Sequence, residues 1–356
     1  MTGADLLVAE SFISHQIDLL RLGAYSSATA IEMIDQLGRE LERILMDPKI
    51  TVFTRDRLTR LLRQAVQVID EYYTDIAAEV HQTLQGVARV EAASSVSALR
   101  SVAGTVLVSL EANLPPQQFL KTLLSRTLIH GARSATWWKR QARDTQIRFA
   151  NVVRAGVIKG ETTPQIVARV LGTPIAPGVL KTSKANARSL VHASIQQVAN
   201  EARLETFKSM GDIVKGVRQL STLDSHTTEI CIAYAGAEWN LSGVPMGRTR
   251  LPFNGGPPRH WGCRSVLVPV TKTFRELGIA RPEVGRLNPR YASADGPTDV
   301  TMRQWLDSRT VEQLNDQLGK GRAKLFRAGK ITLQDLVDGR GNPLTLAQLE
   351  RRVEAR

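Results

Sequence analysis

The chain has 356 residues, more than one hydrophobic core usually supports, so we expect two or more domains. Hydrophobic residues make up 42% and charged residues 23%, a composition that excludes a chain disordered throughout. The net charge of +13 indicates an anionic neighbour, which would be nucleic acid, an acidic protein surface or anionic lipid.

Cysteine usage and hydropathy indicate a protein made and folded in a cytoplasm. Cys231 and Cys263 are the two cysteines, too few for a disulfide framework. The first ten residues lack the basic start of a secretory signal, and Glu10 interrupts their short apolar run. No stretch reaches the roughly 18 apolar residues that a membrane span requires, so we expect no membrane partner.

The first 180 residues predict a helical domain. Thr54 is a good N-cap, and after it apolar side chains recur every three or four residues along roughly nine turns of helix. These positions are Leu58, Leu61, Leu62, Ala65, Ile69, Tyr72, Ile76, Val80, Leu84 and Val87. Residues 31–45 show the same period. Helices of this length predict an elongated bundle.

Residues 119–159 predict a further helix that is strongly basic. This segment contains nine Lys and Arg residues and a single acidic residue, Asp144. Arg126, Arg133 and Arg140 are spaced by seven, which would place them on one side of such a helix, with Arg143 close to them. The surface is either a solvated helix face or a contact for DNA phosphates or for an acidic partner.

After a turn-rich linker at 173–178, the chain changes character. A helix is expected at about 183–210, followed by strands at 213–220 and 266–270 with many Gly and Pro residues between them. The predicted fold is therefore mainly α with a small α+β domain. We expect a helical domain at 1–180, a loop-rich α+β domain at 181–300 and a helical C-terminal tail at 301–356.

The most specific pattern lies between residues 221 and 269. It runs from Ser221 to Cys231 through an Asp-initiated turn and a short helix, and it closes with a Pro-Pro-x-His-x-x-Cys-Arg segment. This pattern resembles the C-terminal domain of the phage Mu F-like head-morphogenesis family, the minor head proteins of tailed bacteriophages. The matching positions are Asp224, Thr227, Thr228, Cys231, Gly236, Pro257, Pro258, His260, Cys263 and Arg264.

A second block is similar to the C-terminal tail of many members of that family. It contains Trp305, the segment 318–331, and leucines that continue to Leu346. Together the two blocks cover about residues 185–350, roughly half of the chain. The resemblance implies a minor capsid component near the portal vertex, with portal protein and other head proteins as partners and several copies per virion.

The motif also offers candidate metal ligands. Cys231, His260 and Cys263 carry the thiolate and imidazole donors that zinc prefers. Many family members have a further Cys where this chain has Thr228, so Asp224 or His226 would have to serve as the fourth ligand. Two other interpretations remain open. Either the cysteines are buried small hydrophobes and His260 forms a hydrogen bond across the turn, or one cysteine is a nucleophile activated by His260 and oriented by Asp224. A disulfide between the cysteines would be expected only after virion release.

Taken together, the sequence predicts a structural minor capsid protein, not an enzyme, located in the virion near the portal and in the host cytoplasm during assembly. Its function would be head assembly or genome delivery. A basic DNA-binding internal protein ejected with the genome is the first alternative, and packaged DNA would then be a partner. A Cys/His-dependent or metal-dependent hydrolase is the second. We expect no cofactor other than a zinc ion.

Overall fold

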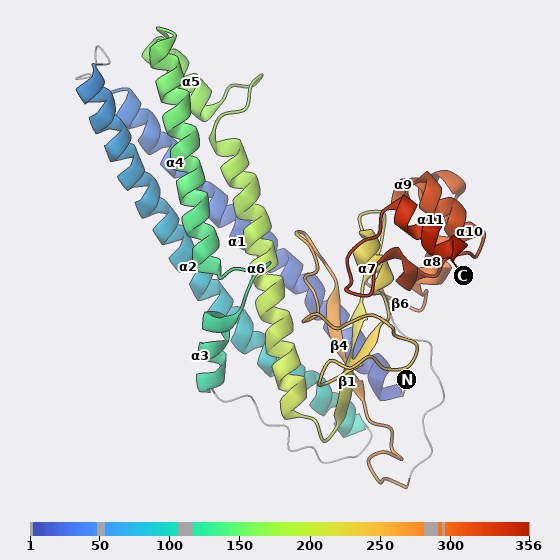
Figure 1. The fold of residues 1–356 in the computed structure, drawn as a ribbon. Coiled ribbons are helices and arrows are strands. Elements are labelled where there is room, and N and C mark those ends of the chain that lie inside the picture. The colour runs from blue at the N-terminus through green and yellow to red at the C-terminus, as the bar shows by residue number, and fades with distance from the viewer. Residues whose placement is uncertain (1–2, 48–53, 106–116, 281–290, 294–295, 356) are drawn as a thin grey trace. The chain divides into compact units, whose positions relative to one another are not determined.

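The structure is a computed structural model that describes residues 3–47, 54–105, 117–280, 291–293 and 296–355 (Figure 1). It is mainly helical with small sheets, as predicted. Six helices come first: α1 (Gly3–Leu45), α2 (Arg55–Thr105), α3 (Gln117–Arg126), α4 (Ser134–Ile158), α5 (Thr163–Leu171) and α6 (Leu180–Ser209). None of the helices in the described ranges is long and apolar enough to cross a membrane.

The chain forms two compact units, and α1, α2 and α6 contribute residues to both. Unit 1 comprises residues 1–20, 87–123 and 196–356, and unit 2 comprises residues 21–86 and 124–195. The structure thus groups the start of α1, the end of α2 and most of α3 with the C-terminal half. The boundaries expected near residues 180 and 300 follow chain order instead, and they stay a prediction.

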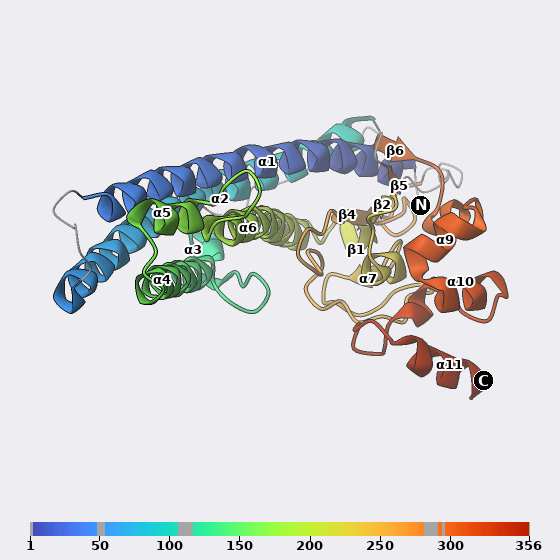
Figure 2. The same ribbon diagram turned by 90° about the horizontal axis from the view of Figure 1, so that it is seen from above.

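Unit 2 is a helical bundle in which α4, α5 and the first half of α6 lie beside α1 and α2 (Figure 2). The predicted stripe on α2 is buried from Leu61 to Val87, apart from Leu62 and Tyr72, which are half-buried. The Tyr73 hydroxyl lies 2.9 Å from Thr145 Oγ1, which lies 2.8 Å from Ser183 Oγ. These buried hydroxyls satisfy one another and so join α2, α4 and α6.

The single helix expected at 119–159 is wrong, because the chain turns between α3 and α4. Gly131 has a φ of 85°, which favours glycine, and Ile129 and Ala132 form an isolated antiparallel bridge. The Trp137 indole donates a hydrogen bond of 2.6 Å to the Ile129 carbonyl and holds this turn against the start of α4. Arg126, Arg133 and Arg140 therefore do not share a helix face.

Unit 1 contains the sheets. The strands are β1 (Val214–Leu220), β2 (Thr222–Leu223), β3 (Glu238–Asn240), β4 (Val266–Thr271), β5 (Tyr291–Ser293) and β6 (Gly296–Thr298), and β1 lies antiparallel between β3 and β4. A second small sheet has the order β2-β5-β6. Pro269 is accommodated because β4 is an edge strand, where the ladder can lose one donor. The strands predicted at 213–220 and 266–270 are confirmed as β1 and β4.

The C-terminal tail shares the hydrophobic core of the sheet. Its elements are α8 (Met302–Asp307), α9 (Val311–Leu318), α10 (Lys320–Arg327), the 3₁₀ helix η1 (Leu333–Leu336) and α11 (Leu346–Glu354). Thr301, Thr310 and Thr345 each begin a helix with a Gln three residues later, in a capping box. Leu314, Phe326 and other apolar side chains of these helices are buried in one cluster with residues of β1.

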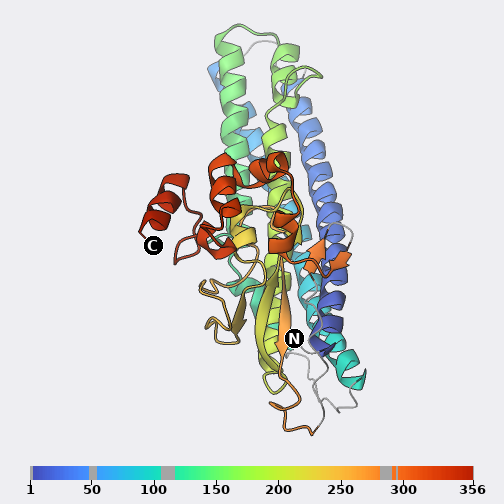
Figure 3. The ribbon, with the colours of Figure 1, turned by 90° about the vertical axis from the view of Figure 1, so that its right-hand side faces the viewer.

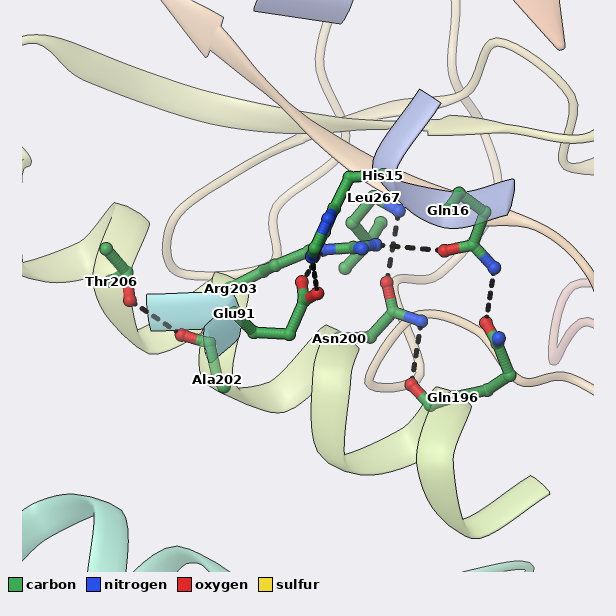
Figure 4. Close-up of polar contacts among 9 residues, drawn as sticks. All are labelled: His15, Gln16, Glu91, Gln196, Asn200, Ala202, Arg203, Thr206 and Leu267. Atoms are coloured by element: carbon green, nitrogen blue, oxygen red, sulfur yellow. Dashed lines mark hydrogen bonds and ion pairs between the residues drawn. The ribbon is translucent and has the colours of Figure 1, made fainter. Parts of the chain in front are cut away.

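A buried ion pair lies at the centre of unit 1. Glu91 on α2 contacts Arg203 on α6, and both side chains are fully buried (Figure 4). The His15 imidazole of α1 contacts the other oxygen of the Glu91 carboxylate. Burial raises the pKa of Glu91, but Arg203 and His15 lower it by more, so it lies below its ordinary value. The carboxylate is therefore charged and compensated within the core.

Neutral polar groups extend this network to the sheet (Figure 4). Arg203 donates to Gln16 Oε1 at 3.2 Å, and Gln16 Nε2 donates to Gln196 Oε1 at 2.6 Å. Asn200 donates to the Gln196 carbonyl and accepts a bond of 3.1 Å from the backbone N–H of Leu267 in β4. Three helices and one strand are thus held in one register.

The ion pair predicts a large loss of stability when one partner is removed. Glu91→Gln leaves Arg203 buried without a counter-charge and should lower the free energy of unfolding of unit 1 by about 3–5 kcal/mol. The double variant Glu91→Leu/Arg203→Met should lie closer to the unaltered protein than either single variant. Denaturant unfolding followed by circular dichroism measures this. Glu205→Gln, which removes a partly exposed pair with Lys208, is the matched control and should have little effect.

The same pair predicts a pH dependence with a defined sign. The pKa of Glu91 in the folded protein is below its ordinary value. The contribution of Glu91 to the free energy of unfolding is therefore complete at pH values above the unfolded pKa of about 4.3. That contribution is lost as the pH falls through the folded pKa. Glu91→Gln should therefore flatten the acid side of the stability profile, and an unchanged acid slope would contradict this assignment.

A candidate metal centre

The first side of the centre is a turn that follows β2. The Asp224 carboxylate accepts hydrogen bonds from the backbone N–H of His226 (2.9 Å) and the hydroxyl of Thr227 (3.2 Å), so it organises this turn. Thr228 is the N-cap residue of the helix that follows the turn, α7 (Glu229–Ala233). Cys231 lies on α7 and is buried.

The second side is the loop 253–265, which returns the chain to β4. Asn254, Gly255, Gly256 and Gly262 have positive φ values, and the Pro257–Pro258 peptide bond is cis. A Cβ atom on Gly256 would lie 2.8 Å from Leu267 Cδ1, so this position requires glycine for space as well as for φ. The loop brings the side chains of His260 and Cys263 to α7.

The three predicted ligands form one cluster, as expected. Cys231 Sγ lies 3.2 Å from His260 Nε2 and 3.6 Å from Cys263 Sγ, and the three ligand atoms lie within 4.8 Å of one another. His260 Nδ1 contacts the Trp261 carbonyl at 2.9 Å. A proton on Nδ1 donated to this carbonyl would leave the Nε2 lone pair directed at the thiols, as in many metal-binding histidines.

The two thiols differ in their electrostatics. Hydrogen bonds from Cys231 and His260 outweigh burial and hold the pKa of Cys263 well below its ordinary value. The hydrogen bond to Cys263 and burial raise the pKa of Cys231 well above its own. The hydrogen bond to Cys263 also raises the pKa of His260. The arrangement favours a thiolate at Cys263.

Arg259 is a neighbour that the sequence did not single out. Its guanidinium lies 3.4 Å from the centroid of the Tyr234 ring, and its Nε donates to Gln219 Oε1 at 2.7 Å. Burial lowers the pKa of Arg259 to about 10, and the two cysteines act in the opposite direction. Arg259 thus supplies positive charge beside the thiols. Arg259 occupies the variable position of the Pro-Pro-x-His segment, so the motif did not indicate that its side chain lies beside the thiols.

Asp224 belongs to a separate ion pair and not to the ligand cluster. Arg264 donates to both carboxylate oxygens of Asp224, at 2.5 and 2.7 Å. Burial raises the pKa of Asp224, but the bonds from Arg264 outweigh it and the pKa is lowered. This bidentate pair links the turn after β2 to the start of β4, so two further motif residues have a structural partner in each other.

The donor set fits a zinc ion. Zn–S bonds of ~2.3 Å in a tetrahedron place two sulfur atoms about 3.8 Å apart, close to the separation here. A cavity of about 10 Å³ adjoins the cluster, the size of one water molecule or ion, and His226 lines it with Cys231 and His260. His226 is exposed and lies outside the cluster of three ligand atoms, so its side chain would have to move to serve as the fourth ligand. Thiolate and imidazole donors would hold the ion as a structural cross-link between α7 and the loop.

The predicted anion contacts are all in unit 2 and do not form one surface on one helix. Arg126 ends α3 and Arg133 is the N-cap residue of α4. Arg140 lies over the Trp137 ring, 5.0 Å from its centroid, and Arg143 is exposed one turn later. Trp138 is buried, as expected for at least one of the two tryptophans.

Comparisons with known proteins return nothing: no family model, no curated protein and no solved structure matches this chain.

The centre predicts stoichiometric metal binding. Protein prepared in the presence of zinc should hold one equivalent, and Co²⁺ in its place should give the absorption bands of thiolate coordination. Cys231→Ser and Cys263→Ser should abolish both signals, and His226→Ala should weaken binding without abolishing it. Asp224→Asn, on the same turn, is the control and should retain the metal. Protein free of metal with both thiols fully reactive would contradict the prediction.

Proposed function

We propose that this chain is a minor head protein of a tailed bacteriophage, a structural component that associates with the portal vertex and acts in head assembly or genome delivery. Residues 181–300 would be its head-morphogenesis domain, and several copies would be present in each virion. The observation that carries the proposal is the way in which the two sequence blocks that resemble that family pack together.

Side chains of the second block bind the turn and helix of the first. Arg322 of the second block donates to Glu229 at 3.2 Å, and Gln317, which directly precedes the segment 318–331, donates to the Thr227 carbonyl at 2.5 Å. Arg322 also donates to the Leu344 carbonyl at 2.8 Å within the second block. Figure 3 shows the red helices of the tail beside the yellow segment that contains α7. The two blocks are separated in sequence, yet together they complete one hydrophobic core. This packing supports the proposal that both blocks belong to one type of domain.

Glycines explain part of this fit. A Cβ atom on Gly341 would lie 2.2 Å from the Tyr234 hydroxyl, and one on Gly321 would lie 2.2 Å from Leu346 Cδ2. A larger residue at Gly341 would displace the tail from Tyr234 of the domain, whereas one at Gly321 would disturb the packing of α10 against α11 within the tail. The close approach supports a tail that belongs to the domain and is not a loose appendage.

The geometry of the cysteine centre supports a structural function over a hydrolytic one. Cys231 and Cys263 are buried, and the adjoining cavity of about 10 Å³ is the size of one water molecule. A nucleophilic thiol needs a cleft for the acyl group and donors for its oxyanion. The positions of Cys231, His260 and Cys263 support a structural cross-link between α7 and the loop. Normal assembly of particles that carry the Cys231→Ala variant would argue against such a cross-link.

One observation favours the DNA-binding alternative. Residues 124–195 contain twelve Lys and Arg residues against Asp144 and Glu161. On α4, Arg140, Arg143 and Arg154 are exposed and recur at helical spacing on one face. Such a face suits the phosphates of packaged DNA, which bind cations without regard to sequence.

The structural proposal predicts a low copy number. Quantitative mass spectrometry of purified proheads and mature particles should detect the chain at far fewer copies than the major capsid protein. Its absence from both kinds of particle, or an abundance near that of the major capsid protein, would contradict the proposal. Co-purification with the portal protein from infected cells provides the second measurement.

The DNA alternative predicts a steep salt dependence. If the α4 face engages DNA, binding to any duplex should weaken as salt rises, with a log–log slope of about −0.9 for each phosphate contacted. The variant Arg140→Glu/Arg143→Glu/Arg154→Glu should then lose that binding. Arg55→Glu/Arg60→Glu/Arg63→Glu, with the same change in charge at exposed positions of α2, is the control. Equal behaviour of the two variants would exclude a specific DNA face on α4.

A further inference from the structure

Unit 2 contains a groove that none of the motif residues lines. Its volume is about 710 Å³, and its lining comes from α1, the start of α6 and the loop 172–178 that joins α5 to α6. Small and apolar residues, among them Gly38, Leu171, Pro174, Pro177 and Ala185, form much of its lining. Four cations and one acid surround this lining, so the groove is both apolar and positively charged.

The cations are only partly compensated. Lys184 pairs with Asp35 across the groove. Arg39, Lys181 and Arg188 are exposed, and the structure gives their side chains no hydrogen bond or ion pair with any residue that it describes. Lys181, Lys184 and Arg188 recur at steps of three and four, so they form a row along one face of α6. Three positive charges thus converge on one groove without partners.

The rim of the groove is preformed. Thr173 N–H donates to the Ala176 carbonyl at 2.7 Å, and Gly172 and Pro177 form an isolated bridge. Gly172 and Gly178 approach so closely that a Cβ atom on Gly178 would lie 2.2 Å from the Leu171 carbonyl carbon. A loop that satisfies its own hydrogen bonds has little conformational freedom to lose when a ligand binds.

The chemistry of the lining distinguishes between anionic partners. Single-stranded nucleic acid sites stack bases on aromatic side chains, and no aromatic residue is found among the described residues that line this groove. Duplex DNA is convex and offers phosphates but no aliphatic groups for the leucine and proline surface. A peptide that alternates carboxylates with aliphatic side chains matches both parts of the lining.

We propose that this groove binds an acidic, aliphatic peptide segment of a partner protein, with Arg39, Lys181 and Arg188 pairing its carboxylates. The inference goes beyond the proposed function and is independent of it, because it uses only residues of unit 2 and no motif residue. It applies whether or not the partner belongs to a phage head.

The test is binding of the full chain to a labelled twelve-residue peptide of alternating Glu and Leu, measured by fluorescence anisotropy at low salt. The same peptide with Gln in place of Glu, and a twelve-residue oligo-dT, serve as competitors. We expect the Glu peptide to bind more tightly than either competitor. Arg39→Glu/Lys181→Glu/Arg188→Glu should weaken it roughly tenfold or more.

Two further variants separate the groove from general charge. Ala185→Trp fills the groove without changing its charge and should also weaken the peptide, since Ala185 is exposed on α6 and its replacement leaves the bundle core intact. The α4 variant Arg140→Glu/Arg143→Glu/Arg154→Glu should bind the peptide as the unaltered chain does. Failure of the peptide to bind, tighter binding of oligo-dT, or equal losses in the groove and α4 variants would overturn the proposal.

Discussion

The ion pair between Glu91 and Arg203 constrains the rest of unit 1. Two fully buried charges are costly to remove from water, and they are tolerated because each has the other as a partner. The His15 imidazole contacts the second oxygen of Glu91, and the Gln16 amide oxygen accepts a hydrogen bond from Arg203. The pair determines how α2 faces α6, and Asn200 carries that register to β4. Since β4 follows directly on the loop with Cys263, the position of the candidate metal centre depends on a core contact made by distant helices.

The centre itself is a set of cross-links between segments that have little regular structure. The Asp224–Arg264 pair, the thiol–imidazole cluster and the stacking of Arg259 on Tyr234 all lie within the short segments around α7 and the returning loop. A loop-rich domain buries less apolar surface per residue than a helical bundle, so specific polar contacts have more to contribute there. The tail adds to this by placing its helices against α7 and sharing the core of the sheet.

Charge is distributed differently in the two units. Unit 1 uses its charges in pairs, several of them buried, to hold elements together. Unit 2 leaves rows of cations exposed, on α4 and along the groove beside α6. Exposed cations without partners contribute little to stability and raise the self-repulsion of the unit. We propose that these exposed cations bind anionic partners, and the shape and lining of each surface favour a different kind of anion.

The sequence by itself determined the mainly helical fold, the stripe on α2, the buried face of α6 and strands β1 and β4, because periodicity and turn residues act locally. It also predicted that Cys231, His260 and Cys263 cluster, since a shared motif implied it. It was wrong about one helix over 119–159, where Gly131 allows a turn that periodicity does not reveal. Only the tertiary structure paired Asp224 with Arg264, placed Arg259 beside the thiols, joined Glu91 to Arg203 across 112 positions and opened the groove at Arg39 and Lys181. Those contacts join residues far apart in the chain, and their partners are chosen by packing, which no local pattern encodes.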